Sequence, residues 1–185
     1  TDVETNLLSW TNEKSQIYKV NADSGKDTEI SEELSGYLER LLKIAKDSDG
    51  AFDPTIGKLI RLWDIGGENQ RIPGEDEIQE VLKDSGYQKI SLDGNTIHMD
   101  EGCSLDLGAA GKGIGCDLIL ENLKNQKDVT AALMNLGGSS VMTYGSKPDG
   151  SSWNVAVTDP RAENDDDYLG VVALNGTEFL STSGD

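Results

Sequence analysis

A run of small residues around Lys112 is the part of the sequence that most clearly suggests binding chemistry. It reads LDLGAAGKGIG over residues 105–115. Small side chains leave backbone N–H groups open to an anion, and the N-terminus of a following helix adds partial positive charge. Lys112 adds a full charge, so the run predicts a phosphate site; a tight turn with a surface lysine is the alternative. It is neither a Walker loop nor a dinucleotide fingerprint, because no Ser or Thr follows the lysine and GxGxxG is absent.

A second segment, GAFDPTIG over residues 50–57, contains Asp53. Pro54 fixes its own φ and pushes the preceding Asp53 out of the helical region. Asp53 can therefore cap a helix that starts at Pro54. Alternatively, the turn can hold a ligand against backbone amides and a fixed carboxylate. The residues by themselves leave both possibilities open.

Two further segments are rich in small residues, NLGGS over 135–139 and STSGD over 181–185. Paired glycines after a strand let a backbone approach a ligand closely, although each segment alone is more often a turn. An acidic cluster lacks the Gly and terminal Glu of a calcium-binding loop, and we interpret it as a loop. Its members are Glu163, Asp165, Asp166 and Asp167.

Cys103, Cys116 and His98 offer little catalytic chemistry. Two cysteines make neither a disulfide framework nor a zinc site, so free thiols are expected. His98 is the single histidine, and it alternates with apolar neighbours in a strand-like run, which favours a structural or surface role. One histidine and no nucleophile elbow argue against a serine-hydrolase triad.

The composition excludes several classes of protein. The 185 residues carry 16 basic and 34 acidic side chains, a formal net charge of −18. Such a chain is not expected to bind nucleic acid through its phosphates, because that binding depends on Lys and Arg. The acidic excess favours solubility. No run approaches the roughly 20 apolar residues of a membrane-spanning helix, and no signal peptide is visible.

These segments need helices and strands to position them. A helix is predicted from near Ser31, with Leu34, Leu38, Leu41 and Ala45 as its buried stripe. Further helices are predicted over 56–62, 75–84 and 112–124, with Ile78, Val81 and Leu82 of the second facing inward. Strands are predicted over 89–92 and 96–99 as a hairpin, over 130–136 as a buried strand, and over 141–144, 153–158, 169–174 and 178–181. This order predicts an α+β fold with a mostly antiparallel sheet and packed helices. No domain boundary is evident, so residues 1–185 are expected to form a single domain.

Together, the motifs resemble the ApbE family, the FAD:protein FMN transferases. The resemblance covers nearly the whole chain, and its pieces occur in the family's order. They are LSW at 8–10, SQI at 15–17 and Asn21; GAFDPTIG at 50–57 with LW at 62–63; DLGAAGKG at 106–113 with Asp117; NLGG at 135–138; WNVAV at 153–157 with DP at 159–160; and STSGD at 181–185.

The resemblance implies an activity and a fold. Members of the family cleave the diphosphate of FAD in the presence of Mg²⁺, transfer FMN to a Thr or Ser hydroxyl of a target flavoprotein and release AMP. Some also hydrolyse FAD to FMN and AMP. The implied fold is α+β and similar to a duplicated T-fold. The implied location is outside the cytoplasm, with a lipid anchor to the membrane.

The same resemblance also implies roles for particular residues. The implied FAD-contacting residues are Trp10, Ala51, Phe52, Asp53, Asp106 and Lys112. Ala109 matches a residue whose backbone carbonyl helps to ligate the metal. Gly111 stands where Ala is common in the family, which should be harmless in a tight turn.

One departure from the family pattern concerns the metal. In the family, the STSG run precedes a stretch whose Asp and Thr or Asp complete the metal site, and this chain stops at Asp185. We therefore expect the sequence to be truncated at both ends, and expect Mg²⁺-dependent transfer by it to be weak or lost. A non-catalytic FAD-binding protein is the alternative function.

Overall fold

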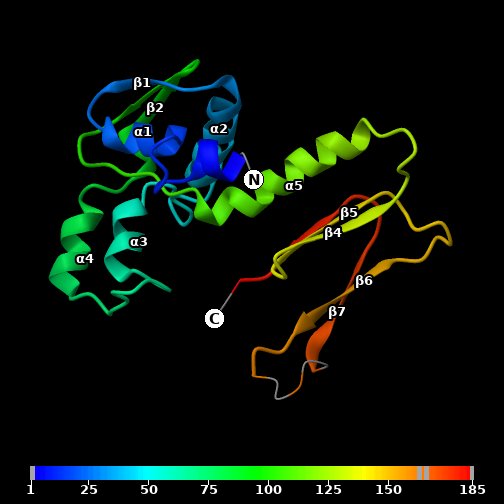
Figure 1. Ribbon diagram of the computed structural model, residues 1–185. Helices are drawn as coiled ribbons and strands as arrows, with labels where there is room; N and C mark the ends of the chain where they lie inside the picture. Colours follow the sequence, from blue (N-terminus) through cyan, green and yellow to red (C-terminus); the bar gives the residue numbers. More distant parts are fainter. Residues whose placement is uncertain (1–2, 162–163, 165–166, 184–185) are drawn as a thin grey trace. The chain divides into compact units, whose positions relative to one another are not determined.

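Helices occupy most of the first part of the chain and strands most of the second (Figure 1). A computed structural model describes residues 3–161, 164 and 167–183. It divides into two compact units, with the boundary between Gly111 and Lys112. The strand pairs in its sheets are antiparallel, which confirms the α+β class with mostly antiparallel sheets. The organisation of residues 1–185 as a single domain stays a prediction.

The first unit begins with two short helices that frame the segment containing Trp10. Its elements are a π-helix η1 (Glu4–Leu8), α1 (Gln16–Ala22), β1 (Asp27–Glu29), α2 (Glu32–Asp47), α3 (Gly57–Trp63), α4 (Glu75–Leu82), a 3₁₀ turn η2 (Tyr87–Lys89), β2 (Ile90–Asp93), β3 (Thr96–Met99) and the start of α5 (Gly108–Lys124). The sequence did not predict α1. Ile17 of this helix is fully buried, so α1 contributes to the core.

Helix α2 supplies much of the core of this unit. The Ser31 Oγ accepts a hydrogen bond of 3.2 Å from the Leu34 N–H and caps the helix where the sequence predicted its start. Leu34, Leu38 and Ala45 are completely buried. Burial of each leucine contributes roughly 1.5–3 kcal/mol relative to exposure. The predicted apolar stripe is therefore the buried face of α2.

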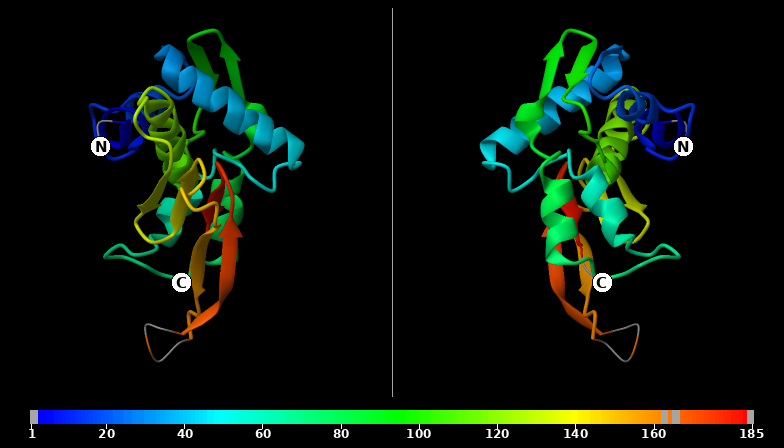
Figure 2. Two further views of the ribbon diagram at one scale, coloured as in Figure 1. Left: turned by 90° about the vertical axis from the view of Figure 1, so that its right-hand side faces the viewer. Right: turned by 90° about the vertical axis from the view of Figure 1, so that its left-hand side faces the viewer.

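The sheet of the first unit has the order β1-β3-β2. Its β2–β3 hairpin turns at Gly94, whose φ of 58° suits glycine. The Ser35 hydroxyl of α2 donates a 2.7 Å hydrogen bond to the Gly94 carbonyl. Figure 2 shows α2 lying along this sheet. Ile97 and Met99, on one face of β3, are each 1% exposed and complete the core.

Helices α3 and α4 lie side by side (Figure 1) and are less well buried than α2. No residue of α4 is buried. The prediction that Leu82 faces inward is wrong, since its side chain is 37% exposed. Leu82 is the last residue of α4, which ends two residues earlier than the predicted bound at residue 84. The inward face therefore holds only Ile78 and Val81, both half-buried.

Helix α5 begins at Gly108, four residues before the predicted start at Lys112. Asp106 is the reason, because its Oδ1 accepts a 2.7 Å hydrogen bond from the Gly108 N–H at the first turn. The alanines of the next turn are strong helix formers. The expected glycine-rich loop is thus largely helical, and Lys112 lies in the second turn.

The second unit contains the rest of α5 and the strands β4 (Ala132–Leu136), β5 (Ser140–Tyr144), β6 (Trp153–Thr158), β7 (Tyr168–Leu174) and β8 (Phe179–Ser181). They form a sheet of order β4-β5-β8 and a hairpin of β6 and β7. Met142 and Thr143 of the central strand β5 are fully buried. The expectation that β4 is buried is wrong, because its residues alternate and Leu133 is 41% exposed. β4 is an edge strand, and one side of it meets solvent.

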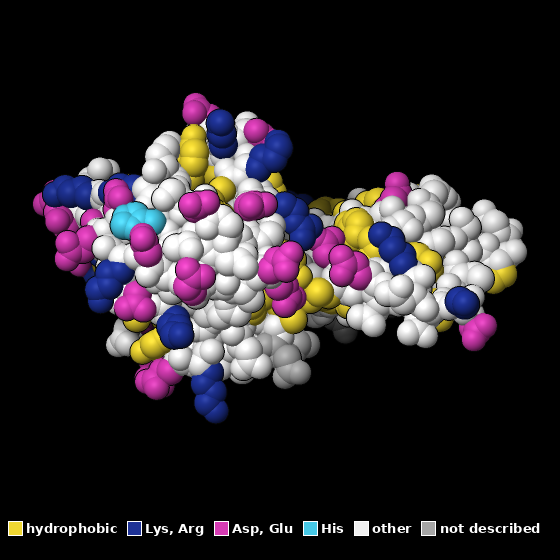
Figure 3. All heavy atoms as spheres, turned by 90° about the horizontal axis from the view of Figure 1, so that it is seen from above, with side chains coloured by type: hydrophobic (Ala, Val, Ile, Leu, Met, Phe, Trp, Pro, Cys, Tyr) yellow, Lys and Arg dark blue, Asp and Glu magenta, His cyan; other side chains and the backbone are white. Residues whose placement is uncertain are grey.

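Charged groups of both signs are interspersed on the face shown in Figure 3. This pattern accords with the sequence expectation of a solvated acidic surface. Within the described part of the chain, no helix has the length and apolar character needed to cross a membrane.

Candidate functional site

The structure brings the first two motif segments together. The Asp106 N–H donates to the Pro54 carbonyl at 2.9 Å, and the Gly57 N–H donates to the Ser104 carbonyl at 3.0 Å. Ile56 and Ser104 form a parallel β-bridge. A Cβ added at Gly57 would lie 2.8 Å from the Ser104 carbonyl oxygen, so only glycine allows this close approach. Residues 54–57 and 104–106 therefore lie side by side.

Asp53 closes the turn that leads into this contact. Its Oδ1 accepts hydrogen bonds from the Thr55 N–H at 2.8 Å and the Thr55 hydroxyl at 2.6 Å. Its Oδ2 accepts from the Tyr87 N–H at 2.9 Å. The next helix, α3, begins only at Gly57 and has no side-chain cap. Asp53 thus forms an Asx turn instead of a helix cap, and its carboxylate also fixes the start of η2.

Ala51 and Phe52 precede this turn at its outer edge. Ala51 is exposed, and Phe52 is half-buried. The Phe52 N–H donates a 3.1 Å hydrogen bond to the Ser48 hydroxyl just after α2. The contact of Ala51 and Phe52 with FAD stays a prediction.

Asp106 is buried and lies between Ser104, which forms the β-bridge, and the start of α5 at Gly108. Its side chain is 9% exposed, and its Oδ1 holds the first N–H of the helix. The preceding residue, Leu105, is clamped by Asn21 of α1, which donates to its carbonyl at 2.9 Å and accepts from its N–H at 2.7 Å. Asn21 was part of the sequence motif without a defined role. The structure shows that it fixes the segment before Asp106.

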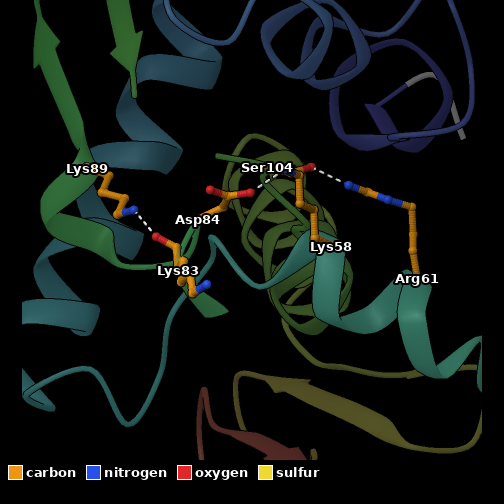
Figure 4. Close-up of polar contacts among 6 residues, drawn as sticks. All are labelled: Lys58, Arg61, Lys83, Asp84, Lys89 and Ser104. Atoms are coloured by element: carbon orange, nitrogen blue, oxygen red, sulfur yellow. Dashed lines mark hydrogen bonds and ion pairs between the residues drawn. The ribbon is translucent and has the colours of Figure 1, made fainter. Parts of the chain in front are cut away.

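Trp10 and Arg61 meet beside Ser104. The Arg61 guanidinium carbon lies 5.2 Å from the centroid of the Trp10 ring. Its Nη2 donates a 2.7 Å hydrogen bond to the Ser104 hydroxyl, as Figure 4 shows. Burial lowers the pKa of Arg61, and the charge of Asp106 opposes that shift. The only sequence signal for Arg61 is its place one helical turn after Gly57, and no motif includes it.

Figure 4 also shows a second set of polar contacts near Arg61. Lys58, on the same helix, pairs with Asp84 at 2.5 Å. Lys89 donates to the backbone carbonyl of Lys83. The ion pair with Lys58 is the main cause that lowers the pKa of Asp84. These contacts tie α3 and η2 to the segment that follows α4, next to the turn of Asp53.

Lys112 belongs to a separate cluster in the second unit. Its ammonium group donates to the Ser139 hydroxyl, and a Cβ added at Gly137 would lie 3.7 Å from that ammonium. The Ser139 carbonyl accepts a 2.8 Å hydrogen bond from the Thr182 N–H. The three sequence motifs at 112, 135–139 and 181–183 therefore meet here. The Lys112 side chain is exposed.

The predicted metal ligand Ala109 is the second residue of α5 and is exposed. Among the described residues, no three His, Cys, Asp or Glu side chains gather in a way that could hold a metal ion. Of the acidic cluster, Glu163, Asp165 and Asp166 lie outside the described residues. The donor set that the described chain presents does not fit a complete Mg²⁺ site.

Cys103, Cys116 and His98 lie outside the contacts described above. Cys103 and Cys116 are free, as expected, and the structure shows that both are buried. Burial raises the pKa of the Cys103 thiol to about 11. His98 Nδ1 lies 2.8 Å from Asp27 Oδ1 across the β1–β3 pair. None of the three takes part in the contacts described around Trp10 or Lys112.

Comparison with known proteins identifies the family. The sequence profile described as the ApbE family matches residues 2–185. The chain belongs to the ApbE family. The FAD:protein FMN transferase of Treponema pallidum (strain Nichols) is 30% identical over 170 residues, covering 83% of this chain and 47% of that protein. The FAD:protein FMN transferase of Escherichia coli (strain K12) is 29% identical over 192 residues, covering 99% of this chain and 53% of the relative.

Solved structures of ApbE proteins have the same fold. The crystal structure of the ApbE protein from Thermotoga maritima matches with a TM-score of 0.84 at 31% identity, covering 93% of this chain and 56% of that one. The apo form of Pseudomonas stutzeri flavinyl transferase ApbE gives 0.82 at 29% identity, covering 99% and 57%. The ApbE resemblance seen in the sequence is thereby confirmed. The chain spans about half the length of the curated relatives that it matches.

Proposed function

We propose that the protein acts in the transfer of FMN from FAD to a Thr or Ser hydroxyl of a target flavoprotein, with release of AMP. The observation that carries this proposal is the family match over residues 2–185, together with relatives named FAD:protein FMN transferase. The substrate is FAD, and the partner is a flavoprotein with an accessible acceptor hydroxyl. Nucleic acid is not a partner, in keeping with the charge of −18.

In this proposal the first unit binds FAD through the residues around Asp53 and Trp10. Support comes from the contact of residues 54–57 with 104–106, which fixes Asp53 and Asp106 on one framework. The half-exposed indole of Trp10 offers a flat apolar surface for a flavin or adenine ring. Ala51 and Phe52 line the edge of the same turn. The family resemblance also assigns an FAD contact to Lys112, whose positive charge suits a diphosphate.

The transfer step breaks the phosphoanhydride bond of FAD and forms a phosphoester bond to the acceptor. The acceptor oxygen bonds to the phosphorus on the FMN side of the diphosphate, and the bond from that phosphorus to the bridging oxygen breaks. AMP leaves with the bridging oxygen, and the hydroxyl proton passes to a base. When water replaces the hydroxyl, the products are FMN and AMP, which is the proposed pyrophosphatase side activity. Negative charge grows on the diphosphate oxygens during this step, so a lysine that contacts these oxygens lowers the barrier.

Mg²⁺ dependence is part of the proposal and rests on family membership. A bound Mg²⁺ would supply charge neutralisation at the diphosphate. The backbone carbonyl of Ala109 is the proposed ligand, although it lies in the first turn of α5 and the described residues add no cluster of three metal-binding side chains. We therefore assign no step of the reaction to the metal.

A non-catalytic FAD-binding protein is the second candidate, and the incomplete set of metal donors among the described residues favours it. The two candidates differ in one product. The 185-residue chain is titrated with FAD, FMN and AMP, with and without Mg²⁺, while flavin fluorescence is followed. AMP is then assayed after incubation with FAD and a flavoprotein acceptor that has a Thr at its modification site.

Saturable binding of FAD, tighter than that of FMN or AMP, supports both candidates. Release of AMP with flavin attached to the acceptor supports transfer and eliminates the carrier. Binding without AMP at any Mg²⁺ concentration supports the carrier. Absence of FAD binding in all conditions contradicts both.

We also propose that the protein works outside the cytoplasm with a lipid anchor to the membrane. The support is the family resemblance alone. Cell fractionation with an antibody against the protein tests it. Recovery in the membrane fraction, with release by a lipoprotein-cleaving treatment, is the expected outcome, and recovery among cytoplasmic proteins contradicts it.

A further inference from the structure

We propose that Arg61 is a positioning residue that holds the indole of Trp10 in place for the flavin ring of FAD. This inference rests on the proposed function, because it assigns a role in FAD binding. It concerns a side chain that the sequence motif did not single out. The geometry around Ser104 carries it (Figure 4).

The position of Arg61 is fixed from two sides. Its Cα belongs to α3, which begins at Gly57 against the Ser104 carbonyl. Its guanidinium donates to the Ser104 hydroxyl at 2.7 Å, and Ser104 is only 4% exposed. A planar guanidinium held by a buried hydroxyl has few orientations open to it. Arg61 is therefore a rigid surface against which another group can pack.

Trp10 needs such a surface. It follows η1 in a short connection, and its side chain remains 36% exposed, so the core does not fix the ring. The Arg61 guanidinium carbon lies 5.2 Å from the ring centroid, within cation–π range. Arg61 thus covers one face of the indole, and a planar ligand stacks on the other face.

The electrostatics favour positioning over a salt bridge. Among the described residues, no carboxylate lies within ion-pair distance of Arg61. Asp106 attracts the guanidinium without such a contact. The charged group of Arg61 contacts a neutral hydroxyl and an aromatic face.

The test uses the 185-residue chain labelled with 5-fluorotryptophan and followed by ¹⁹F NMR. The resonance of Trp10 is assigned by its loss in Trp10→Phe. Arg61→Gln is expected to shift that resonance, since it removes the cation from the ring. The matched control is Arg40→Gln, because Arg40 also lies over a ring, 5.3 Å from the centroid of Tyr37. The control should leave the Trp10 resonance unchanged.

Binding of FAD, riboflavin and ADP separates positioning from direct contact with phosphate. Arg61→Gln is expected to weaken FAD and riboflavin alike, by roughly three- to thirtyfold, and to leave ADP unchanged. The double variant Trp10→Leu, Arg61→Gln should bind FAD no more weakly than Trp10→Leu alone, because Leu has no aromatic ring and Arg61 acts through the indole. Arg61→Lys should recover part of the loss, since it keeps the cation.

Two results overturn the inference. One is an unchanged Trp10 resonance in Arg61→Gln. The other is weaker FAD binding with unchanged riboflavin binding, which means that Arg61 contacts the diphosphate itself. Circular dichroism checks the fold of each variant. If Arg61→Gln does not fold, the same NMR and binding measurements are made on Arg61→Lys. If the wild-type chain binds no flavin, the proposed function fails and the flavin role of Arg61 fails with it. If the wild-type chain binds FAD and only the results expected for the Arg61 variants are not obtained, the proposed function stands.

Discussion

Asn21 and Leu105, 84 residues apart, form a two-point clamp in which one side-chain amide satisfies both backbone groups of the leucine. The donor and acceptor of Asn21 are both used, at 2.9 Å and 2.7 Å. Leu105 is completely buried, so its backbone groups have no ready access to water. The clamp therefore holds the segment that precedes Asp106 against α1.

Replacement of Asn21 by Ala should lower the free energy of unfolding by about 1–3 kcal/mol, because two buried backbone groups lose their partners. Chemical denaturation measures the loss. The control is Asn122→Ala, since Asn122 makes one 3.4 Å hydrogen bond on the exposed surface of α5. It should change stability by less than about 0.5 kcal/mol. Equal effects of the two variants would contradict the clamp.

Gly57 tests the close approach of α3 to the segment at 104–106. A Cβ there meets two backbone carbonyl oxygens, those of Ser104 at 2.8 Å and Leu105 at 3.0 Å. Gly57→Ala should cost about 1–3 kcal/mol, as overpacking in a rigid site does. Gly36→Ala is the control, since nothing lies within 4 Å of its added Cβ. Because Gly36 lies inside α2, Ala should stabilise it by roughly 0.5–1 kcal/mol, so opposite signs are expected in thermal melts.

The thiols should be slow to react in the folded protein. Burial raises the pKa of Cys103 to about 11 and raises that of Cys116 as well. The reactive thiolate is therefore scarce at pH 8, and burial also blocks access. Iodoacetamide followed by mass spectrometry should find both cysteines unmodified while free glutathione reacts fully. Both should react once guanidinium unfolds the chain. Rapid labelling of native Cys103 would show that its segment opens readily.

Glu77 is expected to titrate well below an ordinary glutamate. Hydrogen bonds from Arg71 and from the Gly74 N–H lower its pKa from 4.5 to about 2. The unfolded chain takes up this proton near pH 4.5 and the folded chain only near pH 2. The contribution of Glu77 to stability is thus complete above pH 4.5 and is lost as the pH falls through that interval.

Comparison of Glu77→Gln with the wild type measures this contribution. The difference in melting temperature should be constant near neutral pH and should shrink below about pH 4.5. NMR titration of the Glu77 carboxyl carbon gives the pKa directly. A difference that grows on acidification would reverse the sign of the linkage.

Asp53 and Lys112 are both proposed to contact FAD, and the structure predicts that their variants differ in stability. Asp53→Ala removes the acceptor of three hydrogen bonds and should cost about 1–3 kcal/mol. Lys112→Ala removes an exposed side chain and should change stability by less than about 0.5 kcal/mol. Both should weaken FAD binding, Lys112→Ala by about tenfold. FAD titrations and denaturation curves of the same samples check both. Unchanged FAD affinity in both variants would contradict the site assignment.

Local patterns in the sequence were enough to predict several elements. The cap at Ser31 and the stripe from Leu34 predicted α2, and the turn at Gly94 predicted the β2–β3 hairpin. Both signals lie within a few residues of the structure that they specify. The early start of α5 was missed because the composition of residues 108–111 suggested a loop, whereas the Asp106 cap and the alanines favour helix.

Long-range contacts account for what the sequence did not predict about the candidate site. Arg61 meets Trp10 and Ser104 only after α3 docks on the segment at 104–106. No spacing in the sequence relates these residues. The motif match did predict that Asp53 and Asp106 belong to one site, and the structure places their segments in contact. Whether FAD binds there stays a prediction.

The pairing of β1 with β3 has a consequence for how the chain folds. Asp27 lies opposite His98 in that pair, 71 residues later, and α2, α3 and α4 are made between them. Closing so long a loop costs entropy before any contact repays it, so the first unit should fold slowly for its size. During synthesis α2 can form early, but the sheet waits for the residues of β3. A nascent chain that stalls before residue 96 would expose Leu34 and Leu38, the buried face of α2, to chaperones.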